Sequence, residues 1–352
     1  MHVAVEGAVV RAIASTVPQN VLQVDSLVNQ FGDLKRIIAG SGIRELRIAD
    51  PEITTADLCA HAARRLFDSV PLDPHSVDGL LFVSQTPDYR LPATSAVLQH
   101  KLGLPRDLVT FDVNHGCVGH VYGLFQAATL IASGACRRVL VLAGDTISKL
   151  VSPRDRTIRV LMGDAGSATL VEKGEGTLTF DLRTDGERFE CLIVPAGGAR
   201  RPHSAESAVA TEHPDGNWRS PDHLFMDGLK ITEFALSEVI PLIQESLDAN
   251  SLRIADLDQV IFHQASRFIV SSMTNRLGLP EDKAPLLVER FGNTSSASIP
   301  MTLCQKFGTL EPQQRNSELR NTMLVGFGVG LCWGTALADL SRTRIFPVED
   351  LS

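Results

Sequence analysis

Hydrophobic and polar positions follow two different periods along the first half of the chain. Residues 53–69 repeat apolar side chains at spacings of three and four, which predicts an amphipathic helix beginning near Thr54 or Thr55. Residues 79–85 form a short, nearly continuous apolar run, typical of a strand buried on both faces. Strand and helix patterns then alternate, which indicates a mainly parallel sheet with crossover helices. The other predicted elements are strands over 5–15, 109–114 and 137–145 and helices over 95–103 and 119–134.

The second half of the chain repeats the first. Three short segments recur in the same order, displaced by 180, 175 and about 184 residues: 78–82 by 258–262, 102–105 by 277–280, and 137–144 by 321–328. Three similar segments in the same order and at similar offsets indicate a gene duplication. We therefore predict two α/β halves, residues 1–174 and 175–352. Residues 199–222 are polar without periodicity and predict a long surface loop or a lid over a site.

Composition narrows the class of protein. The 352 residues are 44% hydrophobic and 21% charged, which excludes a disordered, collagen-like or coiled-coil chain. A formal net charge of −8 argues against nucleic-acid binding. Neither a signal-peptide pattern nor an apolar run of membrane-spanning length occurs in the sequence, so we expect a cytoplasmic protein without membrane contact.

The six cysteines show no C-x-x-C pair, so the sequence signals neither a zinc site nor a disulfide framework. One of them, Cys117, lies between a predicted strand and the long apolar helix. The unpaired N–H groups at the start of that helix would stabilise a thiolate and a developing oxyanion, which makes Cys117 a candidate nucleophile. The spacing alone is equally compatible with a structural role, in which Cys117 is a small buried residue that lets the strand and helix pack closely. The others are expected to be packed thiols: Cys59, Cys136, Cys191, Cys304 and Cys332.

Two polar residues of the second half occupy corresponding places. His263 follows the apolar run 259–262, at the carboxyl end of a predicted strand where α/β folds collect site residues. Asn293 stands 176 residues after Cys117, close to the equivalent point of the repeat. Taken singly, the histidine could be structural and the asparagine a turn or helix cap. Together, one Cys, one His and one Asn at matched strand ends form a candidate catalytic constellation.

Five motifs in order carry a family resemblance. They are FDVNHGCVGHVYGL (111–124), GDAGSA (163–168), FHQAS (262–266), FGNTSSASIP (291–300) and VGFGVGLCWGTAL (325–337). With these motifs the chain resembles the β-ketoacyl-[acyl-carrier-protein] synthase III family of the thiolase superfamily. The resemblance spans nearly the whole chain. It implies a thiolase-like fold in which two duplicated α/β halves form a five-layered α-β-α-β-α arrangement.

The resemblance also implies a reaction. Cys117 would take an acyl group from an acyl-CoA or acyl-carrier-protein donor, and malonyl-carrier protein would then condense with it as carbon dioxide leaves. His263 and Asn293 would hydrogen-bond the malonyl thioester carbonyl and stabilise the enolate. The backbone N–H groups of Cys117 and Val329 would form a second oxyanion hole. No cofactor and no metal is implied; the thioesters are substrates.

Residues that would bind the substrates depart from the family pattern. Arg36 falls where a nucleotide clamp is expected, while Arg156 matches a nucleotide-side position. Leu91 corresponds to a pocket-gating residue that is donated across a homodimer. Glu233 and Phe268 replace basic positions for carrier-protein docking, which leaves the neighbouring Arg267, Lys230 and Arg276 as candidate contacts.

Other functions stay open at this point. The Cys-bound acyl group could pass without decarboxylation to an alcohol, amine or aromatic acceptor in a specialised pathway. A silent partner subunit is disfavoured because Cys117, His263 and Asn293 are all present. A papain-like cysteine hydrolase lacks its C-G-S-C-W run here. The sequence does not determine the acyl chain, the donor type or the pathway.

Overall fold

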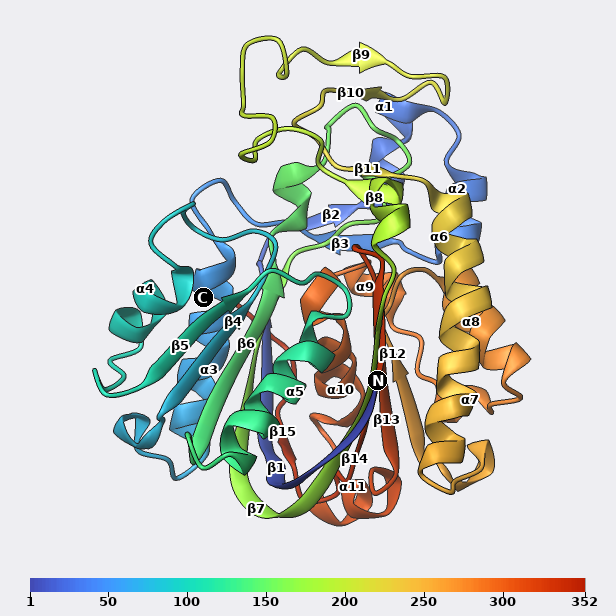
Figure 1. The fold of residues 1–352 in the computed structure, drawn as a ribbon. Coiled ribbons are helices and arrows are strands. Elements are labelled where there is room, and N and C mark those ends of the chain that lie inside the picture. The colour runs from blue at the N-terminus through green and yellow to red at the C-terminus, as the bar shows by residue number, and fades with distance from the viewer. Residues whose placement is uncertain (352) are drawn as a thin grey trace.

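One hydrogen-bonded sheet of ten strands organises residues 1–351, the part of the chain that the computed structural model describes (Figure 1). It folds into two leaves because the long strands β1 and β7 belong to both: the first part of β7 pairs with β6 and the last part with β14. The strands are β1 (His2–Val17), β4 (Gly79–Val83), β5 (Val109–Val113), β6 (Arg138–Asp145), β7 (Ala165–Thr184), β12 (Gln259–Phe262), β13 (Thr322–Gly328), β14 (Cys332–Ala338), β15 (Arg344–Ile345) and β16 (Glu349–Asp350).

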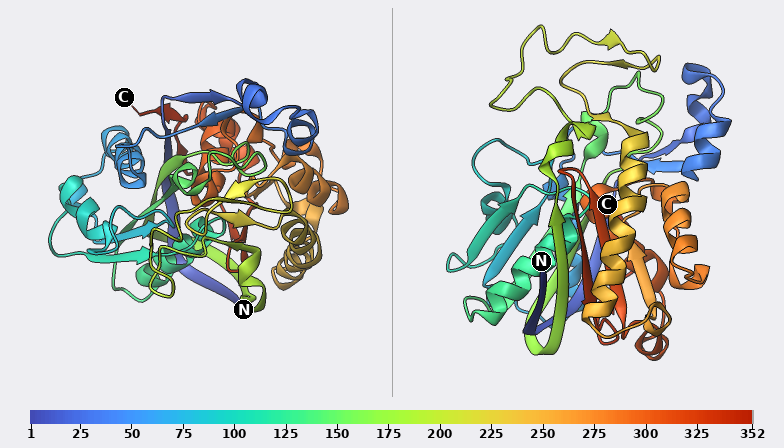
Figure 2. Two further views of the ribbon diagram at one scale, coloured as in Figure 1. Left: turned by 90° about the horizontal axis from the view of Figure 1, so that it is seen from above. Right: turned by 45° about the vertical axis from the view of Figure 1, so that its right-hand side comes forward.

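Helices lie between the two leaves of the sheet and on their outer faces, so that helices and leaves alternate in five layers (Figures 1 and 2). Two helices fill the space between the leaves, and the others lie outside. The central layer is α5 (Gly119–Ala132) and α10 (Ser298–Phe307); the outer layers are α3 (Thr55–Ser69) with α4 (Thr94–Lys101), and α6 (Gly228–Phe234), α7 (Ile240–Ala249) and α8 (Arg267–Arg276). The predicted five-layered α/β architecture is therefore confirmed. The expectation of a mainly parallel sheet is wrong, because β7 pairs antiparallel with β1, β6 and β14, and β13 pairs antiparallel with β14.

Shorter elements lie around this body. Three small antiparallel pairs are β2 (Val21–Gln23) with β3 (Glu45–Arg47), β8 (Leu192–Ile193) with β11 (Phe225–Met226), and β9 (Thr211–Glu212) with β10 (Trp218–Arg219). The short helices are α1 (Val28–Phe31), α2 (Lys35–Ser41), α9 (Val288–Phe291) and α11 (Pro312–Glu318).

The sequence echoes correspond to equivalent structural elements. The echoed strands β4 and β12 pair in parallel with β6 and β13 respectively. The echoed LGLP segments follow α4 and α8, and each contains a glycine in the left-handed region, with φ of 63° at Gly103 and 65° at Gly278. Glycine adopts this conformation without steric cost, so both helices end in the same way. The repeat is thus a repeat of structure.

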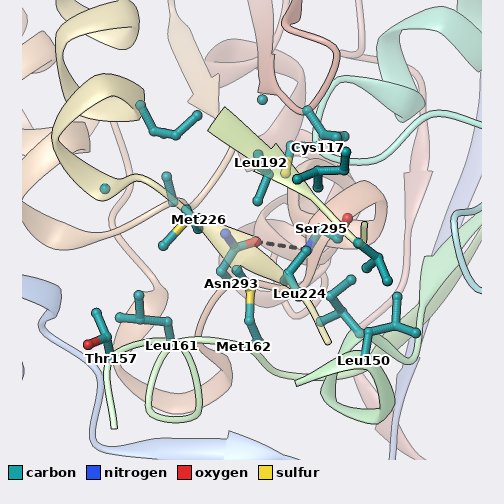
Figure 3. Close-up of a pocket in the computed structure, with 18 of the residues that line it drawn as sticks. Cys117, Leu150, Thr157, Leu161, Met162, Leu192, Leu224, Met226, Asn293 and Ser295 are labelled. Carbon is teal, nitrogen blue, oxygen red and sulfur yellow. Dashed lines mark hydrogen bonds between the residues drawn. The ribbon is translucent and has the colours of Figure 1, made fainter. Parts of the chain in front are cut away.

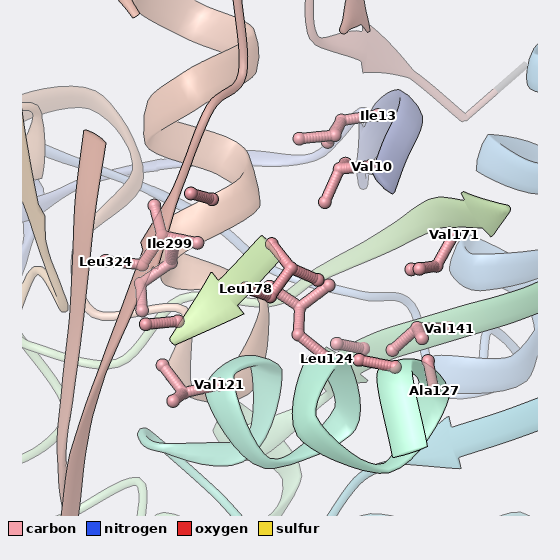
Figure 4. Packing of buried hydrophobic residues seen from close by; sticks show 14 of the residues in the cluster. Val10, Ile13, Val121, Leu124, Ala127, Val141, Val171, Leu178, Ile299 and Leu324 are labelled. Atoms are coloured by element: carbon pink, nitrogen blue, oxygen red, sulfur yellow. The ribbon is translucent and has the colours of Figure 1, made fainter. Parts of the chain in front are cut away.

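Apolar side chains of both halves meet between the leaves (Figure 4). The side chains of α5 and α10 form one buried cluster with those of β1, β7 and β13. Leu124 of α5, Leu303 of α10 and Leu324 of β13 are almost fully buried in it. Because this cluster joins the start of α5 to the second half, burial of its apolar surface also fixes the place of Cys117.

The predicted start of the helix over residues 53–69, near Thr54 or Thr55, is confirmed. Thr54 caps α3: its hydroxyl accepts a hydrogen bond from the backbone N–H of Asp57, and the Asp57 carboxylate accepts one from the Thr54 N–H. This reciprocal pair satisfies two backbone donors at the start of the helix.

All six cysteines are free and buried. For the five other than Cys117, this agrees with the predicted packed thiols. None of the helices formed by residues 1–351 combines the length and apolar character needed to cross a membrane.

Candidate active site

The structure brings Cys117, His263 and Asn293 to the wall of one cavity. Figure 3 shows Cys117 and Asn293 in this wall. Cys117 precedes the first turn of α5, His263 follows β12, and Asn293 precedes α10. All three are buried. Three residues from separate parts of the sequence thus converge where the ends of the two halves meet, as the repeat predicted.

Glycines allow the second half to approach the nucleophile closely. A Cβ atom at Gly328, at the end of β13, would lie 2.8 Å from Cys117 Cβ and 2.9 Å from Cys117 Sγ. A Cβ atom at Gly326 would lie 2.7 Å from Val118 Cα. Real Cβ atoms do not approach other heavy atoms so closely, so the contact requires glycine at both positions. The following residue, Val329, is consequently held beside the sulfur.

The Cys117 sulfur is in an environment that favours the neutral thiol. Burial raises its pKa to about 12, and the negative charge of Asp145 acts in the same direction. The Ser295 hydroxyl and the backbone N–H groups of Cys117 and Val329 lower the pKa of the sulfur by hydrogen bonding. The sequence-based expectation of a stabilised thiolate is therefore wrong for the resting state. The same donors nevertheless face the point where negative charge would develop.

The His263 ring is held by packing. It stands edge-on to Phe327, with ring centroids 5.3 Å apart and an interplanar angle of 81°. Its Nδ1 atom is buried without a hydrogen-bond partner among residues 1–351. Burial lowers the His263 pKa to about 3, so the imidazole is neutral at physiological pH. A neutral ring can donate a hydrogen bond to a substrate oxygen without carrying a charge of its own.

Asn293 is oriented by its own loop. Its side-chain Oδ1 accepts a hydrogen bond of 2.9 Å from the backbone N–H of Ser295. The Nδ2 group, the donor of the carboxamide, is then left for the cavity. Ser295 has a φ of 48°, an unusual conformation for a residue other than glycine and one that clusters at functional sites. Backbone hydrogen bonds also join Asn293 to Leu161 and Gly163 of the first half.

Asp145 is a site residue that the sequence analysis missed. It ends β6 and is fully buried beside the cavity. Its carboxylate accepts five hydrogen bonds, from the Ser84 hydroxyl, the Gln85 N–H, the Thr86 hydroxyl, and both the N–H and hydroxyl of Ser296. Burial raises its pKa, and these donors oppose the rise. The signal that identified His263, a polar residue at the carboxyl end of a buried strand, also applies to Asp145, which is the last residue of β6.

The cavity has a volume of about 870 Å³, and α2, α6 and α8 form part of its wall. Of the predicted substrate-binding and docking positions, Arg36 and Phe268 line it. Arg267 packs against Gly42, since a Cβ atom at Gly42 would lie 2.6 Å from Arg267 Nε. Arg156 lines a separate, smaller cavity with Arg154 and Trp218. Leu91 is not part of the cavity wall and is 82% exposed.

The polar segment 199–222 forms an anchored hairpin at one end of the molecule (Figure 1). Arg219 is buried, and its guanidinium contacts the carboxylates of Asp155 and Asp215 at 2.7 Å each. His203 and Asp222, near the two ends of this segment, line the cavity, and a hydrogen bond of 2.7 Å joins His203 Nδ1 to Asp222 Oδ2. Of the two sequence-based interpretations of this segment, a plain surface loop and a lid, the second agrees better with these contacts.

Residues 1–351 contain no cluster of three or more His, Cys, Asp or Glu side chains that could hold a metal ion. The cavity therefore combines a thiol at a helix start, backbone N–H groups beside the sulfur, and two neutral polar side chains, His263 and Asn293, in the same wall. These groups suit transfer of an acyl group through a covalent thioester. Together with the layered fold, they define the class of the protein: an acyltransferase of the thiolase-like fold.

Comparisons with known proteins agree. The family model described as "3-Oxoacyl-[acyl-carrier-protein (ACP)] synthase III" matches residues 111–186, and that of its C terminal matches residues 247–340. A putative 3-oxoacyl-[acyl-carrier-protein] synthase 3 of Campylobacter jejuni is 32% identical over 94% of this chain and 94% of its own. A β-ketoacyl-[acyl-carrier-protein] synthase III of Desulfitobacterium hafniense is 35% identical over 88% of this chain and 90% of its own.

Solved structures show the same relationship. The 3-oxoacyl-(acyl-carrier protein) synthase of Burkholderia xenovorans has a TM-score of 0.91 and 34% identity, covering 99% of both chains. The priming β-ketosynthase of the R1128 polyketide pathway has a TM-score of 0.79 and 26% identity, over 97% of both chains. The chain belongs to the β-ketoacyl-[acyl-carrier-protein] synthase III family, whose members are condensing acyltransferases.

Proposed function

We propose that Cys117, His263 and Asn293 carry out a two-stage condensation. In the first stage Cys117 Sγ attacks the carbonyl of an acyl thioester, the donor thiol leaves, and the thiol proton passes to the leaving sulfur. In the second stage malonyl-carrier protein loses carbon dioxide, and the enolate carbon attacks the Cys117 thioester. A carbon–carbon bond forms, the bond to Sγ breaks, and Sγ regains a proton.

The observation that carries this proposal is that two neutral polar side chains, His263 and Asn293, line the same cavity as the Cys117 thiol. An enolate forms only if its oxygen is stabilised as carbon dioxide leaves. The lowered pKa of His263, a result of burial, keeps that ring uncharged, and the Asn293 orientation leaves its Nδ2 group available. The N–H groups of Cys117 and Val329 face the sulfur and would bind the oxyanion of the acyl group. In this proposal residues 1–174 bring the nucleophile and residues 175–352 the donors.

Acyl carrier protein is the proposed partner, with acyl-CoA or acyl-carrier protein as donor and no cofactor. The thioester arm would enter between α2, α6 and α8, where Arg36 lines the cavity and Arg267 lies beside it. Basic residues at the opening would attract the acidic surface and phosphate of the carrier. Arg156, in its smaller cavity beside Arg154, would contact the nucleotide end of a CoA donor.

A homodimer in the cytoplasm is the proposed working form. β5 is an outermost strand of the sheet, and Phe111 on it is 48% exposed. Tyr89 and Leu91 are exposed as well, so an apolar surface adjoins an open strand edge. Pairing of two copies there would cover Phe111 and bring Leu91 to the partner. Sedimentation equilibrium should then report twice the 38.1 kDa chain mass, and a monomer would contradict the proposal.

Two measurements test the reaction. Incubation with acyl-CoA and acyl-carrier-protein donors should add one acyl mass to the protein, at Cys117, by intact-mass and peptide mass spectrometry. Cys117→Ala should abolish this labelling. Cys136→Ala is the matched control, because Cys136 is also buried but packs against Gly79, outside the cavity wall.

The second measurement is release of labelled carbon dioxide from malonyl-carrier protein. Wild type should release it, and His263→Ala and Asn293→Ala should lower the rate at least about 100-fold, consistent with loss of an oxyanion donor. Acylation of Cys117 without any release would reject the condensation. It would favour instead transfer of the acyl group to an alcohol, amine or aromatic acceptor.

A further inference from the structure

The cavity is much larger than the smallest acyl group needs. Each methylene of an aliphatic chain takes roughly the space of one water molecule, about 30 Å³. The cavity volume is about 870 Å³. If half of that volume holds the thioester arm, the remainder would hold roughly fourteen methylenes. A two-carbon acyl group would leave most of it unfilled.

Two parts of the cavity wall differ in how many polar groups they carry. The part formed by α2, α6 and α8 offers hydrogen-bonding or charged groups from Arg36, Ser41, Thr232 and Ser266, beside apolar side chains such as Ile37 and Phe268. Such groups suit the amides and phosphate of a thioester arm. The part of the wall around Asn293 carries mainly aliphatic and thioether side chains, with Thr157 beside Leu161 (Figure 3). We call the apolar residues of this part the inner pouch; they are Ile147, Leu150, Leu161, Met162, Leu192 and Leu224.

The pouch walls belong to the packed interior. Ile147, Met162, Leu192 and Leu224 are part of the same buried cluster, and Leu150 packs against it. Figure 3 shows Met162 and Leu224 close to Asn293 and Ser295. A backbone hydrogen bond of 2.8 Å from the Leu224 N–H to the Leu150 carbonyl oxygen joins two of the walls. The pouch is therefore formed by fixed residues rather than by a mobile loop.

We propose that the inner pouch holds a saturated aliphatic acyl chain of roughly eight to fourteen carbons, attached to Cys117. This inference rests on the proposed function and adds the substrate class. The pouch side chains provide no hydrogen-bonding partner for a polar acyl group but ample apolar contact for methylenes. Each methylene transferred from water into such a site improves binding roughly fourfold. Met162, an unbranched and polarizable side chain, can adjust to chains of different shape.

The test is a competition for Cys117. Equimolar acetyl-, butanoyl-, octanoyl- and dodecanoyl-CoA, and separately the same acyl groups on carrier protein, are mixed with the protein, and the acyl masses are followed with time. We expect octanoyl or dodecanoyl to label Cys117 at least about 100-fold faster than acetyl, given roughly fourfold per methylene over several methylenes. Fastest labelling by acetyl would overturn the inference and leave the proposed function intact. No labelling by any donor, or equal labelling of Cys117→Ala, would reject the proposed function itself.

A variant places the chain within the cavity. Leu150→Trp adds bulk to the pouch at a half-buried position, and Met162→Phe is a second variant in case the first does not fold. Both should lower the ratio of dodecanoyl to acetyl labelling at least about 20-fold, the equivalent of two to three methylenes. Val209→Trp, at a 58% exposed position of the hairpin, should not change the ratio. An unchanged ratio in a folded pouch variant would show that the chain lies elsewhere and overturn the inference.

Discussion

Asp145 of the first half and Ser296 of the second half are joined by two hydrogen bonds. Asp145 Oδ2 accepts from the Ser296 N–H at 3.3 Å and from the Ser296 hydroxyl at 3.0 Å. The other carboxylate oxygen binds the segment after β4, including the Gln85 N–H at 2.7 Å. One carboxylate therefore ties together the loops that carry Gln85 and Asn293 next to Cys117. We expect this connection to position the two halves of the site.

Replacing Asp145 by Asn should loosen this connection. A carboxamide has one acceptor oxygen, so its NH₂ group would face donors that the carboxylate now satisfies. Unmet buried donors cost about 1–3 kcal/mol, and we expect the free energy of unfolding in urea to fall by that amount. Condensation should slow by about tenfold or more, since small misplacements are costly. Asp73→Asn, an exposed cap residue, should change neither quantity, and full activity of Asp145→Asn would refute the positioning role.

The same variant should make Cys117 react at lower pH. The Asp145 carboxylate helps to raise the Cys117 pKa, after the larger effect of burial. Removing the negative charge lowers the cost of forming the thiolate. The rate of Cys117 alkylation by iodoacetamide, followed against pH, should therefore rise at lower pH in Asp145→Asn than in wild type. Identical pH profiles would mean that the Asp145 charge does not affect the pKa of Cys117.

Gly328→Ala should damage the site without unfolding the protein. The new methyl group would lie within 3 Å of Cys117 Cβ and Sγ, so the end of β13 or the nucleophile must move. We expect the acylation rate to fall at least about 100-fold, as for misplacement of reacting groups by about 1 Å. The matched control is Gly186→Ala, because no atom lies within 4 Å of its Cβ position. Equal acylation by both variants, measured by intact mass, would show that the close approach is dispensable.

His120 should make the protein less stable in mild acid. Burial lowers its pKa from 6.5 to about 3. Between these values the unfolded chain binds a proton that the folded chain does not, so the free energy of unfolding falls as pH falls below 6.5. At pH 5 this amounts to about 2 kcal/mol.

Comparison with His120→Gln isolates this effect from other groups. Asp164, whose pKa burial raises to about 6, acts in the opposite sense, because its folded form binds a proton before the unfolded form does. The loss of stability between pH 7 and pH 5, from urea unfolding, should be smaller by about 2 kcal/mol in His120→Gln than in wild type. His75→Gln, on the surface, serves as control. The same loss in all three proteins would contradict the prediction.

Arg219→Ala should release the 199–222 hairpin. Asp155 is fully buried and would keep its carboxylate without the guanidinium that now lies 2.7 Å away. Removing one partner of a buried ion pair costs about 3–5 kcal/mol. Limited proteolysis should then cut within 199–222 under conditions in which wild type resists. Arg201→Ala, exposed on the same segment, should stay resistant, and resistance of Arg219→Ala would show that other contacts hold the hairpin.

The periodic segments were predictable because local sequence determines them. The apolar spacing of 53–69 and the Thr54 cap specify α3, and the apolar runs specify β4 and β12. The duplication then placed His263 at a strand end, because equivalent strands of a repeat end at equivalent points. The sequence by itself therefore determined the fold class and the three residues that converge on the cavity.

The tertiary structure decided what depends on how the two halves pack. No local pattern relates Asp145 to Ser296, because their hydrogen bonds exist only after α5 and α10 have packed between the leaves. The neutral state of the Cys117 thiol also depends on tertiary packing, since burial and the carboxylate of Asp145, 28 residues away in the sequence, raise its pKa. The inner pouch likewise depends on side chains from separate segments. Local side-chain periodicity determines which residues are buried. Contacts between separate segments determine the protonation state of Cys117 and the volume of the cavity.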